Sequence, residues 1–338
     1  METADPVPGA RAASGLRARH EAPDTVRGPR HGARGTVKGA VRPLLKWAGG
    51  KRQLLPALRA FYPDHFDRYY EPFVGSGAVF FDLYASGRLN GARATLTDSN
   101  PDLIGCYEMV RDRTAEVASA LARLARGHEA RGADHFYEVR ARFNRMRLKP
   151  AASRVAYTPA LAAMLIYLNR TGFNGLFRLN GHGEFNVPAG RYVRPRIWDV
   201  AHLHGVAGAL GKSGVRLALA PFERVLATAR AGDFVYFDPP YAPLSATARF
   251  TAYTSRPFTL TDQARLCEIA VALARRGCGV MVSNSSAPEV AALYEGDPRV
   301  ADAGLVVHRI PARRAINSRA SARGPVTEFL LTNLPPRL

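Results

Sequence analysis

The amino-acid sequence predicts an α/β fold in which one sheet is divided along the chain by a mostly helical insertion. Two observations support this class. From Pro43 onward, apolar runs alternate between strand-like and helix-like spacing and are separated by glycine and proline, as an α/β domain requires. Between about residues 112 and 225, helical and loop patterns predominate, and strand patterns return after that region.

The first 40 residues lack the composition of a folded unit. They contain seven basic and four acidic residues, one leucine and no aromatic residue, so they have too little apolar surface to bury. We expect a disordered basic arm over residues 1–40. Such an arm either adds nonspecific phosphate contacts or is a dispensable tail.

The elements of the sheet are predicted in a regular order after this arm. The expected strands cover 69–75, where the strand runs into a glycine-rich turn, and then 93–97, 233–237, 279–283, 304–310 and 328–332. The expected helices cover 54–61, 78–86, the stretches between residue 100 and about residue 148, and 260–276. A loop rich in glycine, asparagine and arginine occupies 169–196.

The charge of the chain favours a polyanionic partner. Its 47 Lys and Arg exceed its 28 Asp and Glu by 19, which makes nucleic acid the first candidate, with an anionic membrane or a merely basic protein as alternatives. Residues 131–196 alone hold twelve basic and three acidic side chains. The loop in this region also contains Phe173, Phe177 and Tyr192, and aromatic rings among arginines suit base stacking and phosphate contact.

Other classes of protein are disfavoured. The three cysteines show no CxxC spacing and no even framework, which argues against a zinc site and a disulfide scaffold, so no metal is expected. No apolar run approaches the roughly 18 residues of a membrane span, and the N-terminus lacks the apolar core of a signal peptide. We expect a cytoplasmic protein with no membrane partner.

The segment 71–77, Glu-Pro-Phe-Val-Gly-Ser-Gly, lies between a predicted strand and a predicted helix. Its glycines allow a ligand to approach the backbone closely, although the turn alone is weak evidence. Asp98 follows Gly75 by 23 residues at the end of the next strand, where a carboxylate accepts hydrogen bonds from ribose hydroxyls. Asp98 is equally placed to cap the helix that opens at Asn100, and the two roles are compatible.

The tetrapeptide Asp238-Pro239-Pro240-Tyr241 follows a predicted strand and carries the most specific chemistry. An exocyclic amine on a nucleobase is a poor nucleophile because its lone pair is delocalised into the ring. The Asp238 carboxylate and the Pro239 carbonyl can both accept from that amine, which directs the lone pair toward a methyl donor. Tyr241 offers a flat face on which a flipped base stacks.

A second glycine-rich helix entry lies at 46–51, Lys-Trp-Ala-Gly-Gly-Lys. Two cations flank its glycines, which suits the binding of a carboxylate. The alternative, with Trp47 as a core anchor and Lys51 as a surface charge, is equally compatible with the sequence.

With these residues in place, the chain resembles the Dam family of DNA adenine N6-methyltransferases. The order of cofactor motif, target-recognition insert and catalytic motif is that of the α arrangement. The resemblance runs from Leu45 to about Thr332 and rests on the segments 45–51, 71–77, 169–176, 183–188 and 238–245. Residues 316–323 are similar to the family's loop before the last strand, either as a phosphate or cofactor contact or as a solvated hairpin.

The resemblance implies the Rossmann-like sheet of S-adenosylmethionine-dependent methyltransferases, mostly parallel with one antiparallel strand. The catalytic domain is expected in 41–111 and 226–338, and a mainly helical DNA-recognition insert in 112–225. The implied activity is methyl transfer from S-adenosylmethionine to the N6 atom of a flipped adenine in duplex DNA, with GATC as the expected site. The expected partner is double-stranded DNA, bound by a monomer with no obligatory protein partner.

The same resemblance and motifs define the expected site residues. Catalysis is assigned to Asp238, Pro239 and Tyr241. The expected cofactor contacts are Trp47, Lys51, Phe73, Gly75, Gly77, Asp98 and Asp238. The expected DNA contacts are Lys46, Phe173, Asn174, Leu176, Arg178, Pro188 and Arg191.

Two alternative functions stay open at this point. The acceptor pair at Asp238 and Pro239 suits any planar exocyclic amine, including cytosine N4 in DNA or a base in RNA. An idle DNA-binding relative that no longer turns over is the rival from a different class.

Overall fold

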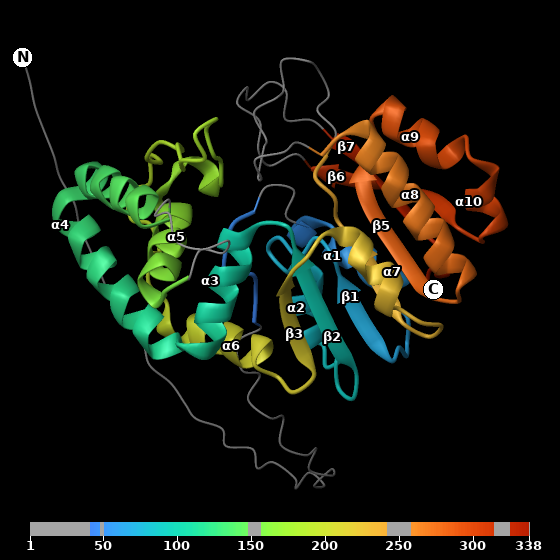
Figure 1. Cartoon of the computed structure of the whole chain (residues 1–338), viewed down its shortest axis with the longest axis horizontal. Coiled ribbons are helices and arrows are strands. Elements are labelled where there is room, and N and C mark those ends of the chain that lie inside the picture. The colour runs from blue at the N-terminus through green and yellow to red at the C-terminus, as the bar shows by residue number, and fades with distance from the viewer. Residues whose placement is uncertain (1–40, 48–50, 148–156, 242–257, 314–324, 338) are drawn as a thin grey trace, which may run out of the picture. The chain divides into compact units, whose positions relative to one another are not determined.

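The computed structural model describes residues 41–47, 51–147, 157–241, 258–313 and 325–337 (Figure 1). These residues belong to one compact unit that spans Ala40–Leu338. Four parts of the expectations fall outside the described residues, namely the arm 1–40, the glycines of the helix entry at 48–50, the end of the catalytic segment at 242–245 and the loop 316–323.

A seven-stranded sheet organises this unit, with the strand order β3-β2-β1-β4-β5-β7-β6. The strands are β1 (Arg68–Glu71), β2 (Arg93–Asp98), β3 (Val215–Leu219), β4 (Phe234–Phe237), β5 (Gly279–Ser285), β6 (Val306–Arg313) and β7 (Pro325–Thr332). The pairs from β3 through β5 are parallel, whereas β7 runs antiparallel to both of its neighbours. The predicted fold class, a mostly parallel sheet with one antiparallel strand, is therefore confirmed.

The alternation of side chains along the central strand explains why the sheet is covered on both faces. All four residues of β4 are buried. Phe234 and Tyr236 belong to one hydrophobic cluster, whereas Val235 and Phe237 belong to the other, because successive side chains of a strand point to opposite faces. A strand that is apolar on both faces is typical of a parallel sheet between two layers of helices.

The helices are α1 (Leu55–Leu58), α2 (Ala78–Ala85), α3 (Pro101–Asp112), α4 (Thr114–Arg147), α5 (Pro159–Thr171), α6 (Val200–Leu210), α7 (Val225–Thr228), α8 (Leu260–Arg275), α9 (Pro288–Glu295) and α10 (Pro298–Asp302). Short polar side chains begin several of them, as the capping of free backbone N–H groups requires. Asn100 accepts from two amides at the start of α3, and Thr259 forms a capping box with Asp262 at the start of α8. The expected helix over 54–61 is one α turn, followed by a 3-10 turn at Arg59–Phe61.

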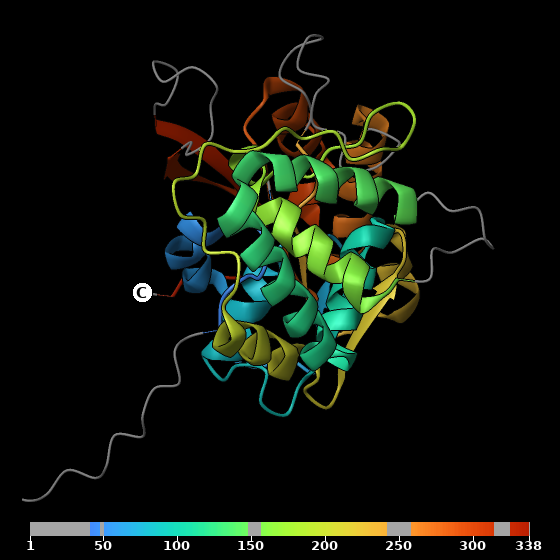
Figure 2. The same ribbon diagram turned by 90° about the vertical axis from the view of Figure 1, so that its left-hand side faces the viewer.

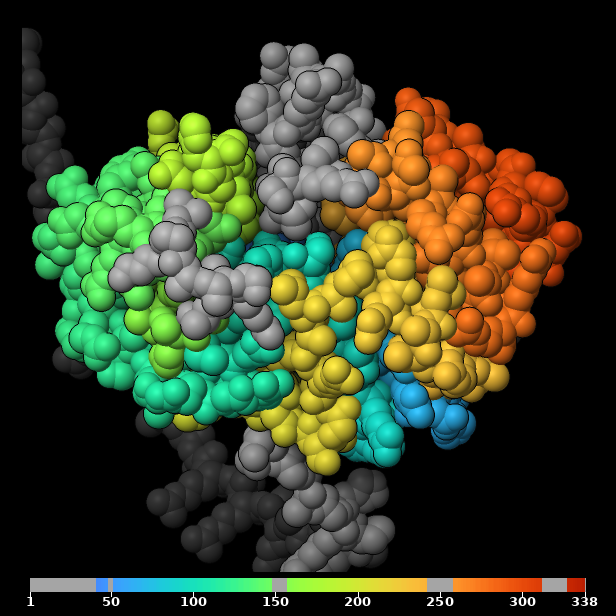
Figure 3. All heavy atoms as spheres, viewed as in Figure 1, coloured from blue at the N-terminus to red at the C-terminus, as the bar shows by residue number. Residues whose placement is uncertain are grey.

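One strand of the sheet differs from the expectation. β3 lies inside the range 112–225 that the sequence assigns to the insert, yet it pairs with β2 along its whole length. Its sequence signal is weak because β3 is an edge strand, in which Leu217 is buried and the other four residues are half-buried or exposed. The space-filling view shows β3 and the turn after it, in yellow, reaching the surface (Figure 3). The sheet thus resumes at Val215, before the expected boundary.

The helices of the insert extend the core of the sheet. α4 lies along α5, and α5 packs against α3, which directly follows β2 (Figures 1 and 2). Side chains of α4 and α5, such as Phe143 and Leu165, belong to the same buried cluster as Tyr69 of β1 and Tyr236 of β4. The insert is therefore anchored to one face of the sheet by continuous apolar packing. In the described ranges, no helix is long and apolar enough to cross a membrane.

Candidate active site

Three of the predicted motifs follow strands that are neighbours in the sheet. The strand β1 pairs in parallel with β2 on one side and with β4 on the other. The turn 71–77 begins at the end of β1, Asp98 ends β2, and Asp238 follows β4. Because parallel strands end at the same edge of a sheet, residues more than 140 positions apart in the chain come together there.

The glycine-rich turn contains two residues in the left-handed region of backbone conformation. Gly75 and Gly77 have φ values of +45° and +67°, which L side chains rarely adopt. A Cβ atom on Gly75 would lie 3.0 Å from the Cδ1 atom of Trp47. The Tyr107 hydroxyl donates to the Gly75 carbonyl at 2.9 Å. The turn is thus held from one side, and the ring of Trp47 lies where a side chain would otherwise project.

The carboxylate of Asp98 fixes the same turn. It accepts a hydrogen bond from the Gly75 amide at 3.1 Å and another from the Asn100 amide at 2.9 Å. Burial raises the pKa of Asp98 to about 6, because the charged form loses solvation. The capping role expected of Asp98 at the start of α3 belongs instead to the side chain of Asn100.

Two aromatic residues expected at the cofactor pack against other aromatic rings. The Trp47 ring stacks on Phe177, with ring centroids 5.7 Å apart. Phe73 stacks on Phe222 at 5.2 Å and meets Phe258 edge to face. Both are half-buried, so each ring anchors its loop and keeps some exposed surface.

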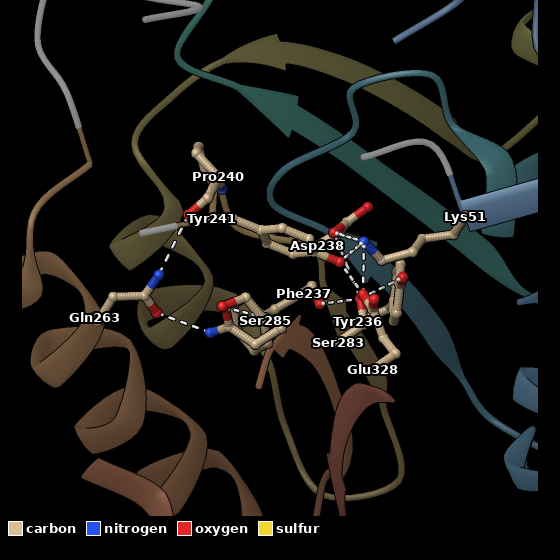
Figure 4. Close-up of polar contacts among 11 residues, drawn as sticks. Lys51, Tyr236, Phe237, Asp238, Pro240, Tyr241, Gln263, Ser283, Ser285 and Glu328 are labelled. Carbon is tan, nitrogen blue, oxygen red and sulfur yellow. Dashed lines mark hydrogen bonds and ion pairs between the residues drawn. The ribbon is translucent and has the colours of Figure 1, made fainter. Parts of the chain in front are cut away.

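The turn Asp238–Tyr241, which the sequence predicts to be the catalytic turn, is joined directly to Lys51 (Figure 4). The Lys51 ammonium lies 2.7 Å from a carboxylate oxygen of Asp238 and donates to the Tyr241 hydroxyl at 2.6 Å. The Ser283 hydroxyl of β5 also donates to Asp238, at 3.5 Å. Lys51 is only 3% exposed, so its interpretation as a surface charge is wrong. It is a buried partner of the Asp238 carboxylate.

Glu328 is a residue of this site that the sequence analysis missed. It comes from the antiparallel strand β7, opposite Ser285 of β5, and its carboxylate lies 3.2 Å from the Lys51 ammonium. It also accepts a hydrogen bond from the Tyr241 hydroxyl. The available signal was one acidic residue at the start of an apolar run, which alone does not distinguish a site residue from the solvated end of a strand.

The charges of this cluster shift one another's pKa. Burial by itself lowers the pKa of Lys51, but Asp238 and Glu328 outweigh it and raise that pKa above its usual value. Burial raises the pKa of Asp238 and that of Glu328, while Lys51 opposes both shifts. The carboxylates therefore take up protons at a higher pH than exposed carboxylates do, and the ammonium stays charged.

Gln263 forms a hydrogen bond with the backbone of the catalytic turn, and the sequence analysis missed this residue too. This α8 side chain is fully buried. Its amide nitrogen donates to the Pro240 carbonyl at 3.2 Å, and its oxygen accepts from Asn284 of β5 at 2.8 Å (Figure 4). The Pro240 carbonyl is thereby fixed in one direction, which sets the orientation of the peptide that leads to Tyr241.

Asn169, at the end of α5, joins the cofactor motif to the basic loop. Its side-chain oxygen accepts from the Lys46 amide at 2.8 Å, and its nitrogen donates to the Lys46 carbonyl at 2.7 Å and the Gly175 carbonyl at 2.8 Å. Asn169 is 2% exposed. Since Trp47 follows Lys46 directly, one amide group holds both the segment of Trp47 and the turn that follows Phe173.

The residues expected to contact DNA lie on this loop and on the segment held by Asn169. Phe173 is 45% exposed, and its amide donates to the carbonyl of the exposed Pro188. Asn174 has a φ of +54°, which is consistent with a tight turn at an exposed tip. Lys46 donates to the Tyr192 hydroxyl at 3.3 Å and lies over that ring.

The remaining residues that were expected to contact DNA differ in their exposure. Arg191 is exposed and Leu176 is half-buried. Arg178 is half-buried, and its guanidinium donates to the Asn186 side chain at 2.7 Å. Phe177 is 3% exposed and packs on Trp47 and Phe185. The interpretation of Phe177 as a stacking residue for nucleic acid is therefore wrong.

Comparison with known proteins agrees with this arrangement. Residues 47–310 match the D12 class of N6 adenine-specific DNA methyltransferases. The Type II methyltransferase M1.LlaDCHI of Lactococcus lactis subsp. cremoris is 36% identical over 87% of this chain and 95% of its own length. The DNA adenine methylase of Escherichia coli K12 is 37% identical over 87% of this chain and 96% of its own.

A third relative and the extent of the match to the family model complete the comparison. The Type II methyltransferase M.MjaIII of Methanocaldococcus jannaschii is 37% identical over 87% of this chain and 99% of its own. The family match includes the glycine-rich turn, Asp98 and the catalytic turn at Asp238. The chain therefore belongs to the D12 class of N6 adenine-specific DNA methyltransferases.

Proposed function

We propose that this protein transfers a methyl group from S-adenosylmethionine to the N6 atom of an adenine that is flipped out of duplex DNA. The observation that carries this proposal is the Asp238–Tyr241 turn, which follows β4 beside the glycine turn that follows β1. Membership of the D12 class and relatives named DNA adenine methylase support it. The specific enzyme class is a site-specific, adenine-specific DNA methyltransferase.

The residues at the edge of the sheet fit S-adenosylmethionine. The left-handed conformations of Gly75 and Gly77 and the Trp47 ring against Gly75 give a turn without a protruding side chain. Asp98 is half-buried and keeps some exposed surface in addition to its two backbone contacts, which suits acceptance from ribose hydroxyls. The bound molecule supplies an electrophilic methyl group on a cationic sulfur.

The remaining cofactor contacts come from both sides of this turn. Trp47 and Phe73 supply aromatic surface, and Lys51 supplies a cation. Lys51 is already in contact with Asp238 and Glu328. A carboxylate on the cofactor would therefore share this ammonium with the catalytic turn, which would link the two sites.

Catalysis by the chain's own residues consists of binding and orientation. The Asp238 carboxylate accepts one N–H of the amine and the Pro239 carbonyl accepts the other, so the nitrogen lone pair is directed at the methyl donor. Tyr241 stacks on the flipped base, and its ring is held by Lys51 and Glu328. No covalent bond between the protein and the substrate is required.

The proposed partner is double-stranded DNA, bound by residues 112–225 together with Lys46. The exposed Phe173, Pro188 and Arg191 and the basic excess of residues 131–196 support this surface, because phosphate contact requires cations and a flipped base leaves a gap for an exposed ring. We also propose GATC as the target, a monomer as the active form and the nucleoid of the cytoplasm as its location.

Expression in cells that lack adenine methylation tests this function. The genomic DNA is mapped for modified bases with a method that reports sequence context, and the Asp238→Ala protein serves as the matched control. We expect N6-methyladenine in GATC with the wild-type protein and none with the variant. Methyladenine in another context would overturn GATC alone, whereas N4-methylcytosine or no modified base in this DNA would overturn adenine N6 in DNA as the substrate.

A further inference from the structure

Two carboxylates share one ammonium in the catalytic cluster. The Lys51 nitrogen lies 2.7 Å from Asp238 and 3.2 Å from Glu328, and the side chains of these three residues are 3%, 21% and 12% exposed. When both carboxylates are ionised, two negative charges and one positive charge leave a net charge of −1. The cluster therefore carries more negative charge than the neutralisation of Lys51 requires.

This excess charge is costly to keep in a buried position. Burial of an ionised carboxylate without a full countercharge loses hydration free energy. Glu328 recovers part of that free energy through hydrogen bonds from Lys51 and Tyr241. A neutral glutamine could accept the Tyr241 hydrogen bond without the same cost, so hydrogen bonding alone does not explain a carboxylate at this position.

A cationic ligand does explain it. In the proposed reaction, the carbon–sulfur bond breaks with its electron pair staying on sulfur, the carbon–nitrogen bond forms, and N6 releases one proton to solvent. The sulfur thus enters with a positive charge and leaves without it. A net negative cluster stabilises the charged donor and does not stabilise the neutral by-product in the same way.

We propose that Glu328 is a positioning residue that holds Lys51 and Tyr241 and gives the site the negative charge by which it favours S-adenosylmethionine over S-adenosylhomocysteine. This inference rests on the proposed function. Asp238 and Lys51 without Glu328 would form a neutral pair, so the preference for the cation is assigned to Glu328.

Binding calorimetry without DNA tests the proposal, since no turnover is involved. Dissociation constants for the two ligands are measured with the wild-type protein, Glu328→Gln, Glu328→Asp and Glu268→Gln. Glu328→Gln keeps an acceptor for Tyr241 but removes the charge. Glu268→Gln removes the same charge from an exposed position on α8, and serves as the control for net charge.

We expect Glu328→Gln to weaken S-adenosylmethionine binding about tenfold and to leave S-adenosylhomocysteine binding nearly unchanged. Glu328→Asp should keep most of the wild-type ratio of the dissociation constants for the two ligands. Glu268→Gln should leave this ratio unchanged. An equal loss for both ligands in Glu328→Gln would mean that Glu328 only maintains local structure, and an unchanged ratio would likewise overturn the proposal. A wild-type protein that binds neither ligand would refute the proposed function itself.

A measurement on the wild-type protein covers the case in which a variant does not fold. Among the described residues, Lys51, Asp238 and Tyr241 are the titratable groups that interact with Glu328, and the buried Glu71 of β1 interacts with Asp238. As the pH is lowered, the two carboxylates with raised pKa take up protons before exposed carboxylates do. The ratio of the two dissociation constants should then shift in favour of S-adenosylhomocysteine, and a ratio that stays constant until the protein unfolds in acid would contradict the proposal.

Discussion

Replacing Asn169 by alanine should weaken both cofactor binding and DNA binding, although this residue is assigned to neither ligand. Its amide makes three hydrogen bonds, two to the Lys46 backbone and one to the Gly175 carbonyl. The first two fix the segment that leads into Trp47, and the third fixes the turn beside Phe173. A single substitution thus releases both the segment that leads into Trp47 and the turn beside Phe173.

The size of the effect follows from these contacts. A typical intramolecular hydrogen bond contributes about 1 kcal/mol net, so the loss of three should lower the free energy of unfolding by about 3 kcal/mol. For a folded unit of roughly 300 residues, with an unfolding entropy of about 2.1 cal/mol/K per residue, that loss lowers the melting temperature by roughly 5 °C. Below this temperature the protein stays folded, but Lys46 and Trp47 are no longer held in one position.

The assay compares Asn169→Ala with Asn144→Ala. Asn144 of α4 also uses its amide twice, donating to the Phe185 carbonyl at 3.0 Å and accepting from the Phe185 amide at 2.9 Å. This contact stays within the insert and does not involve the Lys46 segment. Thermal unfolding, calorimetric binding of S-adenosylmethionine and DNA affinity at fixed salt are measured for both variants.

The expected result is a selective one. Asn169→Ala should weaken the binding of both S-adenosylmethionine and DNA. Asn144→Ala should weaken DNA binding and leave the affinity for S-adenosylmethionine unchanged. If Asn169→Ala keeps wild-type affinity for S-adenosylmethionine while it is destabilised, the link between the cofactor segment and the loop is refuted. Equal cofactor losses in both variants would refute it as well.

Three further predictions concern the edge of the sheet. Gln263→Leu removes the donor to the Pro240 carbonyl, and we expect kcat to fall about tenfold or more with little change in cofactor affinity, measured by single-turnover methylation and calorimetry. The pKa of Asp98 is about 6, and its ionised form is the acceptor, so S-adenosylmethionine affinity should fall as the pH is lowered through about 6. Asp98→Asn should remove this pH dependence. An unchanged pH dependence in this variant would argue against a role of Asp98 in cofactor binding. Gly75→Ala places a Cβ atom 3.0 Å from Trp47 at a positive φ. The substitution should destabilise the protein by about 1 to 2 kcal/mol and weaken cofactor binding. Wild-type stability and cofactor affinity in this variant would contradict the prediction.

The order of motifs along the chain was sufficient to predict the parallel half of the site. Strands that end at Glu71, Asp98 and Phe237 have strong local signals, since each is an apolar or alternating run followed by a polar or glycine-rich turn. The rule that parallel strands share one carboxyl edge then places the three motifs together. The spacing of apolar residues and the positions of polar and glycine-rich turns were therefore enough to predict this part of the fold.

The residues that sequence analysis missed depend on pairing across the sheet. Glu328 reaches the cluster because β7 runs antiparallel to β5, which aligns Glu328 with Ser285. Gln263 lies on the buried face of α8, where a glutamine reads locally as a break in an apolar pattern. The partners of both residues are distant in the chain, so the local pattern does not contain them.

The two ambiguous residues of the Lys46–Lys51 segment were decided by packing. Lys51 is buried between two carboxylates, and Trp47 is both a packing partner of Phe177 and the neighbour of Gly75. The sequence could not separate a buried ammonium from an exposed one because the carboxylates that balance its charge come from β7 and from the turn after β4. The same reasoning applies to Phe177, whose burial depends on Trp47.

The most direct test of the central claim is mass analysis of nucleosides from DNA that has been incubated with S-adenosylmethionine and purified protein. Asp238→Ala serves as the matched variant, with its fold checked by thermal unfolding. We expect N6-methyl-2′-deoxyadenosine with the wild-type protein and none with the folded variant. Turnover by folded Asp238→Ala at the wild-type rate, or methylation of cytosine in place of adenine, would contradict the proposed reaction.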